Sequence, residues 1–143
     1  MVRKGFTLVE LMIVILIVAI LAAVAIPLMS GKIDAAKWSE AKAALGTIAT
    51  AVRAYYAEKG CDSSVAAPTL DSSSSDFVGV TTKDLDGTYF SNKDYKGLDS
   101  AKCENGVVTA TLICEGGSRV GAPKGKVTLT LQADGRQVFS GPE

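Results

Sequence analysis

The segment from Phe6 to Met29 constrains this chain most, because it is almost entirely apolar and long enough to cross a lipid bilayer. As a helix it would span roughly 36 Å, against about 30 Å for the hydrocarbon core of a membrane. Arg3 and Lys4 precede it, so the positive-inside rule places the N-terminus in the cytoplasm and the bulk of the chain outside. Glu10 is the one charged residue from Phe6 to Ser30, and a membrane segment has no evident use for it.

Three interpretations of this segment compete. A secretory signal peptide would explain the basic start and the small-x-small sequence Ala23-Val24-Ala25, but the apolar run exceeds the usual length of about 7 to 15 residues. A plain membrane anchor leaves the carboxylate of Glu10 in lipid, where ionisable groups usually have a partner. No cation lies within the span, so we expect that partner to come from another molecule or from a new chain terminus.

A cut after Gly5 would create such a terminus. It would remove Arg3 and Lys4 and leave a free amine on Phe6, four residues before Glu10. Between helices stacked in register, each amine would lie near the carboxylate of a neighbouring copy. The sequence therefore predicts that Glu10 sets the register of assembly, as a buried polar residue does in a coiled coil.

Residues 4–27, KGFTLVELMIVILIVAILAAVAIP, resemble the N-terminus of type IV pilins and of the related pseudopilins of type II secretion systems. The resemblance implies that a membrane peptidase cleaves after Gly5 and N-methylates Phe6, and that Glu10 guides the subunit into a filament. A leader of five residues, 1–5, is similar to those of the type IVa subclass and of pseudopilins.

The helix is expected to continue past the membrane and to end at Lys59, before Gly60. Apolar residues recur there at intervals of three and four, which predicts a stripe facing a sheet: Trp38, Ala41, Leu45, Ile48, Val52 and Tyr55. Another face carries small residues that suit close helix packing or simply favour helix: Ala43, Ala44, Thr47, Ala51 and Ala54. Pro27 and Gly31 weaken the ladder of hydrogen bonds, so residues 20–31 are expected to stretch or melt on assembly, as the resemblance also implies.

The predicted fold class is α+β. A long helix, residues 6–59 with 6–29 in the membrane, packs on a small antiparallel sheet of three to four strands, in the ladle fold that the resemblance implies. The globular head, residues 60–143, begins with an irregular loop over 60–106 that includes the serine run of 71–76. The sheet follows over 107–143, with alternating strands at 107–114 and 127–131 and a hairpin closed by residues 138–139 after the Asp134-Gly135 turn.

The chain has three cysteines, and the compartment outside the inner membrane favours a disulfide. Cys103 and Cys114 flank the first predicted strand and would lie about 23 Å apart, too far for a bridge. Cys61 must then pair with one of them, and we favour Cys103, because Cys114 shares the phase of buried residues. Many pilins instead carry a disulfide within the C-terminal part of the head, so Cys61 departs from the family pattern.

The residue types argue against catalysis and cofactors. The chain has no histidine, equal numbers of acidic and basic residues, and no phosphate-binding glycine loop. Asp84 and Asp86 are a weak signal for calcium, because one acidic pair is too few ligands for a site. Residues 133–136 are too short for the C-terminal calcium loop of some pseudopilins. We therefore predict no metal, and on the residue types above we predict no cofactor and no nucleic-acid partner.

The resulting interpretation is a structural filament subunit rather than an enzyme. The resemblance implies an inner-membrane precursor, a peptidase and methyltransferase, an assembly platform with minor pilins, and an extracellular homopolymer that serves adhesion, twitching motility or DNA uptake. A periplasmic pseudopilin is the alternative within the family. A monomeric membrane-tethered binding domain is a third interpretation, and it has no use for Glu10.

Overall fold

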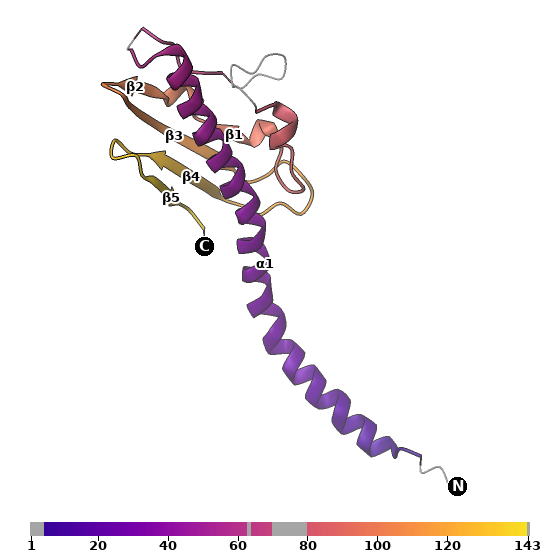
Figure 1. The fold of residues 1–143 in the computed structure, drawn as a ribbon. Helices are drawn as coiled ribbons and strands as arrows, with labels where there is room; N and C mark the ends of the chain where they lie inside the picture. The colour runs from indigo at the N-terminus through magenta and orange to yellow at the C-terminus, as the bar shows by residue number, and fades with distance from the viewer. Residues whose placement is uncertain (1–4, 63, 70–79, 143) are drawn as a thin grey trace. The chain divides into compact units, whose positions relative to one another are not determined.

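The computed structural model describes residues 5–62, 64–69 and 80–142 (Figure 1). It divides into two compact units, Met1–Asp34 and Ala35–Glu143, which we describe separately and call the N-terminal unit and the globular unit. The serine run of 71–76 and the basic residues Arg3 and Lys4 lie outside the described residues.

One helix, α1, spans Leu8–Lys59 and contributes to both units. In the N-terminal unit it passes through Pro27 without a break in helical assignment. At its other end Gly60 adopts a φ of 94°, and its N–H donates to the carbonyl of Tyr56 at 3.0 Å. A glycine in this left-handed conformation is a common helix stop, so the predicted end at Lys59 is confirmed.

The globular unit holds a five-stranded antiparallel sheet (Figure 1). Its central strand β3 pairs with β4 on one side and with the short strands β1 and β2 on the other, and β4 pairs with β5. The strands are β1 (Tyr95–Lys96), β2 (Lys102–Glu104), β3 (Val107–Glu115), β4 (Lys126–Leu131) and β5 (Gln137–Ser140). The α+β class and the long helix over a small antiparallel sheet are therefore confirmed, while the sheet has five strands where three to four were predicted.

The segment expected to be an irregular loop, 60–106, contains more regular structure than the sequence indicated. Strands β1 and β2 lie within it, together with the 3-10 helices η1 (Thr82–Leu85), η2 (Asn92–Asp94) and η3 (Leu98–Ser100). Strands of two or three residues are too short to show an alternating pattern. Their pairing depends on β3, as in the alignment of Tyr95 with Cys114 and of Cys103 with Val108.

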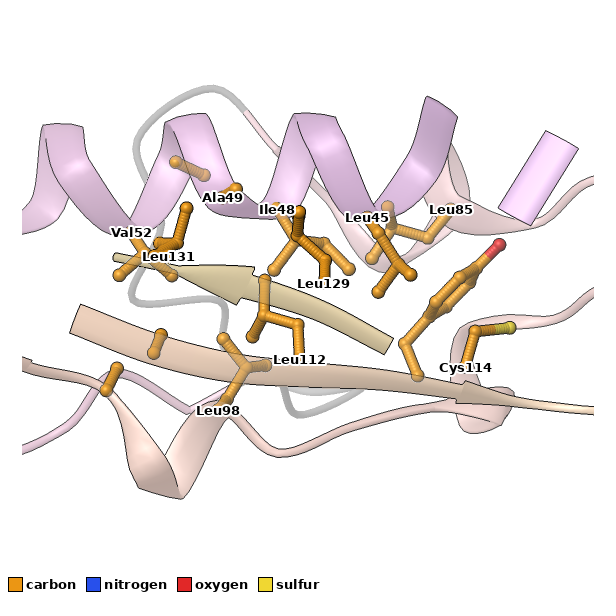
Figure 2. Packing of buried hydrophobic residues seen from close by; sticks show 14 of the residues in the cluster. Leu45, Ile48, Ala49, Val52, Leu85, Leu98, Leu112, Cys114, Leu129 and Leu131 are labelled. Carbon is orange, nitrogen blue, oxygen red and sulfur yellow. The ribbon is translucent and has the colours of Figure 1, made fainter. Parts of the chain in front are cut away.

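The core lies between one face of α1 and one face of the sheet (Figure 2). From the helix come all six residues of the predicted stripe, and each of them is buried. Opposite them are Leu112, Leu129 and Leu131, which are at most 1% exposed. The alternation predicted for the first long strand is also present, because Ala110, Leu112 and Cys114 are buried while Thr111 and Glu115 are exposed.

The small-residue face of the helix differs from the prediction at one position. Ala43, Thr47 and Ala54 are exposed and Ala44 is half-buried, but Ala51 is 4% exposed and belongs to the core. A helix advances about 100° per residue, so Ala51 lies about 60° from Ile48 on one side and about 60° from Ala54 on the other, at the border between the two faces. The core-facing stripe is therefore wider than predicted from the sequence.

Candidate functional site

The candidate site is the segment that leads into α1. Gly5, Phe6 and Thr7 precede the helix without regular secondary structure, and the side chain of Phe6 is 87% exposed. Apart from the neighbouring residues in the chain, no described atom lies within 4 Å of the place where a Cβ on Gly5 would stand. The space beside the Cα of Gly5 is therefore open among the described residues.

Glu10 has a partner within the chain that the sequence analysis missed. Its Oε2 accepts the backbone N–H of Thr7 at 2.9 Å and the Thr7 hydroxyl at 2.7 Å. In return, the N–H of Glu10 donates to the Thr7 hydroxyl oxygen at 3.3 Å. Because Thr7 immediately precedes the helix and Glu10 is its third residue, the pair forms a capping box.

This finding corrects the expectation that the partner of Glu10 comes only from another molecule or from a new chain terminus. The sequence Thr7-Leu8-Val9-Glu10 carries the signature of a capping box, Thr-x-x-Glu before an apolar run. The partner within the chain is thus a neutral hydrogen-bond donor and not a cation. The capping box gives Glu10 a local role in starting the helix, separate from any role of its charge between copies.

The helix surface that follows is apolar on every side. Large apolar side chains from Leu8 to Ile33 are between 47% and 74% exposed. An 18-residue window of α1 has a mean hydropathy of 3.2, and none of it is buried. This helix is thus long and apolar enough to cross a membrane. Its large apolar side chains from Leu8 to Ile33 are left uncovered by the rest of the described chain.

Pro27 and Gly31 lie within this exposed part of α1. Pro27 removes one N–H from the ladder, and the Ser30 hydroxyl donates to the Pro27 carbonyl at 2.9 Å. Among the described residues, nothing but the chain neighbours and the local helix backbone lies within 4 Å of a Cβ built on Gly31. The two residues sit in continuous helix here, so the expected stretching on assembly remains a prediction.

The cysteine pairing is confirmed. Cys61, just past the end of α1, and Cys103, on β2, form a disulfide with their Cα atoms 5.0 Å apart. Cys114 is a buried free thiol, and burial raises its pKa to about 12, helped by the carboxylates of Asp94, Glu115 and Glu40. The bridge therefore ties the end of the helix to the sheet, and the third thiol belongs to the core.

The two aspartates considered for calcium serve the chain's own structure. Asp84 accepts the N–H and the hydroxyl of Thr81, at 2.7 and 2.8 Å. Asp86 accepts the N–H of Asn92 at 3.1 Å and lies 3.5 Å from a guanidinium nitrogen of Arg119. Over the part of the chain that the structure describes, no three His, Cys, Asp or Glu side chains gather in a way that could hold a metal.

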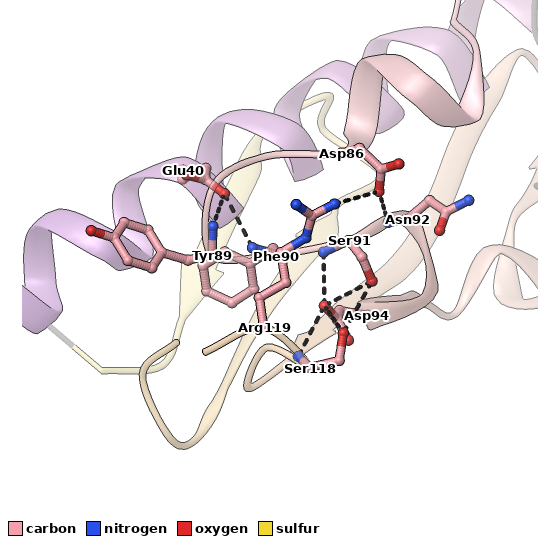
Figure 3. A network of polar contacts seen from close by, with 9 residues as sticks. All are labelled: Glu40, Asp86, Tyr89, Phe90, Ser91, Asn92, Asp94, Ser118 and Arg119. Carbon is pink, nitrogen blue, oxygen red and sulfur yellow. Dashed lines mark hydrogen bonds and ion pairs between the residues drawn. The ribbon is translucent and has the colours of Figure 1, made fainter. Parts of the chain in front are cut away.

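Two further carboxylates fix the loops around the core, and the sequence analysis did not single them out (Figure 3). Glu40 on α1 accepts the N–H groups of Tyr89 and Phe90 at 3.0 and 3.2 Å. Asp94, which is 8% exposed, accepts bonds from both the N–H and the hydroxyl of Ser91 and of Ser118. The bonds from Glu40 to residues 89–90 and from Asp94 to Ser118 join segments far apart in sequence, and no local pattern predicts them. The bonds between Ser91 and Asp94 are local and form a capping box.

Comparison with known proteins places this geometry in context. A family model described as the prokaryotic N-terminal methylation motif matches residues 1–26. The fimbrial protein EcpC of Eikenella corrodens is 35% identical over 137 residues, covering 94% of this chain and 75% of that protein. No solved structure matches the chain at a significant level.

Other relatives match with less coverage of their own length. The type IV major pilin protein PilE1 of Neisseria gonorrhoeae is 39% identical over 114 residues, which are 80% of this chain and 55% of that protein. The type IV major pilin protein PilA of Myxococcus xanthus (strain DK1622) is 48% identical over 57 residues, 40% of this chain and 26% of that protein. The chain thus spans about half the length of the gonococcal relative.

Proposed function

This chain belongs to the type IV pilin family and is a structural protein rather than an enzyme, and we propose that it polymerises into a pilus filament after cleavage behind Gly5 and N-methylation of Phe6. The observation that carries this proposal is the environment of Glu10. The carboxylate of Glu10 stands at the start of a helix segment, from Leu8 to Ile33, whose large apolar side chains are exposed. It lies four residues after Phe6, and the space beside Gly5 is open among the described residues.

Cleavage would change the electrostatics of this segment. It would remove the basic leader and place a cationic amine on Phe6 beside the capping box of Thr7 and Glu10. Only one carboxylate oxygen of Glu10 is used in that box. The other oxygen is therefore free to accept the amine of a neighbouring copy while the helix start stays capped, so register is set without unwinding the helix.

The proposed partners follow from this arrangement. Before assembly, residues 6–29 lie in the inner membrane with the leader in the cytoplasm, where a prepilin peptidase and methyltransferase processes it. An assembly platform in the inner membrane and minor pilins then start the filament. In the filament, which extends outside the cell, the apolar helices of other copies replace the lipid around Leu8 to Ile33. The names of the relatives, type IV major pilins and fimbrial proteins, support a pilus over a pseudopilus.

The mature N-terminus tests the proposal. Mass spectrometry of the chain from surface fibres should give N-methylated Phe6 as the first residue. Gly5→Val should leave uncleaved precursor in the membrane, because a branched side chain occupies the open space beside the bond. A mature chain that begins near Ile26, after Ala25, would instead identify a signal peptide and contradict the proposal.

A further inference from the structure

One loop of the globular unit presents a bare apolar side chain at its tip. The connection from β3 to β4 runs from Gly116 to Gly125, and within it Val120 is 101% exposed. A side chain that touches nothing in its own chain contributes nothing to the stability of the fold. Single exposed apolar residues are common, so the argument depends on how this loop is built.

The loop is held in a fixed conformation from both sides. The N–H of Gly116 donates to the carbonyl of Gly125 at 2.6 Å and closes the base of the loop. Ser118 donates its N–H and its hydroxyl to the buried carboxylate of Asp94, at 3.3 and 3.2 Å (Figure 3). A preorganised loop loses little conformational entropy on binding, so Val120 is presented in the way that a contact residue requires.

The opposite end of the globular unit contains a hollow of about 490 Å³. It lies between the last turns of α1, the turn from β2 to β3 and the turn from β4 to β5. Its lining is mostly uncharged: Tyr56, Ala57, the Cys61–Cys103 disulfide, Val108 and Ala133. Arg53 also lines the hollow, but its guanidinium donates to the carbonyl of Gly135 at 2.8 Å.

The loop and the hollow lie at opposite ends of the same helix segment. The loop packs on Tyr89, whose N–H is bound by Glu40, while Arg53 and Ala57 line the hollow. From Glu40 to Arg53 the helix advances about 20 Å. A protrusion at one end that fits a recess at the other makes a heterologous contact, which repeats without closing and generates an open helical filament.

The loop carries only basic charges, and the surroundings of the hollow carry an excess of acidic ones. Lys124 and Lys126 follow Val120 and are exposed. Asp134 and Arg53 line the hollow, and Asp134 lies 4.0 Å from a guanidinium nitrogen of Arg136. Asp62 and Glu104 lie beside the Cys61 side of the hollow and are exposed. Charge complementarity of this kind fixes the orientation of two surfaces and disfavours contact between two like ends.

We propose that in the filament Val120 of one copy inserts into the hollow of the next copy, so that the globular units form a continuous head-to-tail contact in addition to helix packing. This inference rests on the proposed function and adds a second interface to it. The occupant of the hollow is a second copy of this chain, because every subunit carries both the apolar loop tip with its basic residues and the mostly uncharged hollow with its excess of acidic neighbours.

Cysteine cross-linking in fibres of the full-length chain tests this contact. The double variant Val120→Cys/Ala57→Cys places one thiol on the loop and one in the hollow, both at exposed positions. Mild oxidation should convert most of the subunits into a ladder of covalent multimers on a non-reducing gel. The matched control, Val120→Cys/Thr111→Cys, has its second thiol exposed in the middle of β3 and should give no ladder.

The outcomes separate this inference from the proposed function. A ladder from the first variant but not from the control supports the contact. Fibres of normal yield without a ladder overturn the contact and leave the pilin function intact. Absence of fibres from the unmodified chain, under conditions where the precursor is made and inserted, contradicts both.

A single variant keeps the test decisive if the double variant assembles poorly. Val120→Cys should react with maleimide at least 10-fold more slowly in fibres than in detergent-solubilised subunits, because the hollow covers it. Thr111→Cys should show a smaller difference. Equal rates for Val120→Cys in both states would overturn the contact.

Discussion

At the scale of single residues, Glu10 combines two properties that a substitution can separate. Its shape and oxygens complete the capping box with Thr7, and its negative charge is available to a cationic amine. Alanine removes both properties, while glutamine keeps an oxygen for the Thr7 N–H and loses only the charge. The two substitutions therefore report on capping and on charge separately.

We predict that Glu10→Gln and Glu10→Ala are both inserted and cleaved after Gly5, and that both give at least 10-fold fewer fibres. Fibre yield from sheared cells and the state of the N-terminus by mass spectrometry measure the two steps. The control is Thr7→Val, which removes the hydroxyl of the capping box but keeps the charge of Glu10, and it should lower the yield much less. Normal yield from Glu10→Gln would show that charge does not set the register.

Two buried tyrosines on the same core provide a matched pair. The Tyr56 hydroxyl donates to the carbonyl of Ala101 at 2.8 Å, whereas the buried Tyr95 hydroxyl has no hydrogen-bond partner among the described residues. Removal of a hydroxyl with a buried partner leaves that partner unsatisfied, while removal of an unpaired hydroxyl relieves a desolvation cost.

Tyr56→Phe should therefore lower the free energy of unfolding by about 1 to 2 kcal/mol, and Tyr95→Phe should raise it by about 1 kcal/mol. Urea unfolding of the full-length chain in detergent, followed by near-UV circular dichroism, measures both changes. Equal destabilisation by the two substitutions would contradict the assignment of Tyr95 as unpaired.

At the scale of elements, the disulfide joins the end of α1 to β2 across a sequence separation of 42 residues. The chain-entropy model assigns about 4 kcal/mol to a loop of this length. We predict that Cys61→Ala/Cys103→Ala lowers the free energy of unfolding by up to that amount. A reductant should destabilise the unmodified chain similarly and should have no further effect on the double variant.

Non-reducing peptide mapping checks the same pairing directly. It should recover the peptide of Cys61 linked to that of Cys103, with Cys114 unmodified by alkylating reagents until the globular unit unfolds. A link between Cys103 and Cys114 would contradict the structure, because β3 separates the two along its length.

The helix around Pro27 is the second element with a measurable consequence. Loss of one N–H and the freedom of Gly31 make residues 20–31 the weakest part of the helix. We predict that this stretch unwinds in the filament and lets it extend under load. Pro27→Ala fibres should extend less before breaking in force spectroscopy, and a fibre map showing continuous α-helix from Leu8 to Lys59 would contradict the prediction.

At the scale of the whole molecule, burial of titratable groups sets the response to alkaline pH. The pKa of Cys114 is raised to about 12 from an ordinary value of 9.0, chiefly by burial. Burial also raises the pKa of Tyr95 and of Tyr56. A raised folded pKa means that the folded state holds its proton more tightly, so the stabilisation is complete below about pH 9 and is lost as pH rises toward about 12.

We therefore predict that the free energy of unfolding is flat from about pH 7 to 9 and then falls by up to about 1.4 kcal/mol per pH unit for each group. Cys114→Ala should reduce the slope above about pH 9. The measurement is urea unfolding of the full-length chain at a series of pH values. An unchanged slope in that variant would contradict the burial of the Cys114 thiol as its cause.

Local and periodic signals account for what the sequence predicted correctly. The helix, its end at Gly60, the stripe from Trp38 to Tyr55 and the two long strands each follow from side chains within one element. The capping box of Thr7 and Glu10 was equally local and was available from the sequence. The strands β1 and β2 could not be predicted from the sequence, because two or three residues are too few to show an alternating pattern. Their hydrogen bonds also depend on the position of β3.

The sequence by itself determined the family, the helix and the N-terminal segment, because each of these depends on a pattern of contiguous residues and not on contacts with distant parts of the chain. Only the tertiary structure decided which carboxylates are committed to the fold. Glu40 and Asp94 bind N–H groups of loops 49 and 24 residues away, and Asp86 pairs with Arg119. The tertiary structure also placed Val120 and the hollow at opposite ends of the globular unit. Distances of this kind follow from packing of the whole chain, since no spacing in the sequence encodes them.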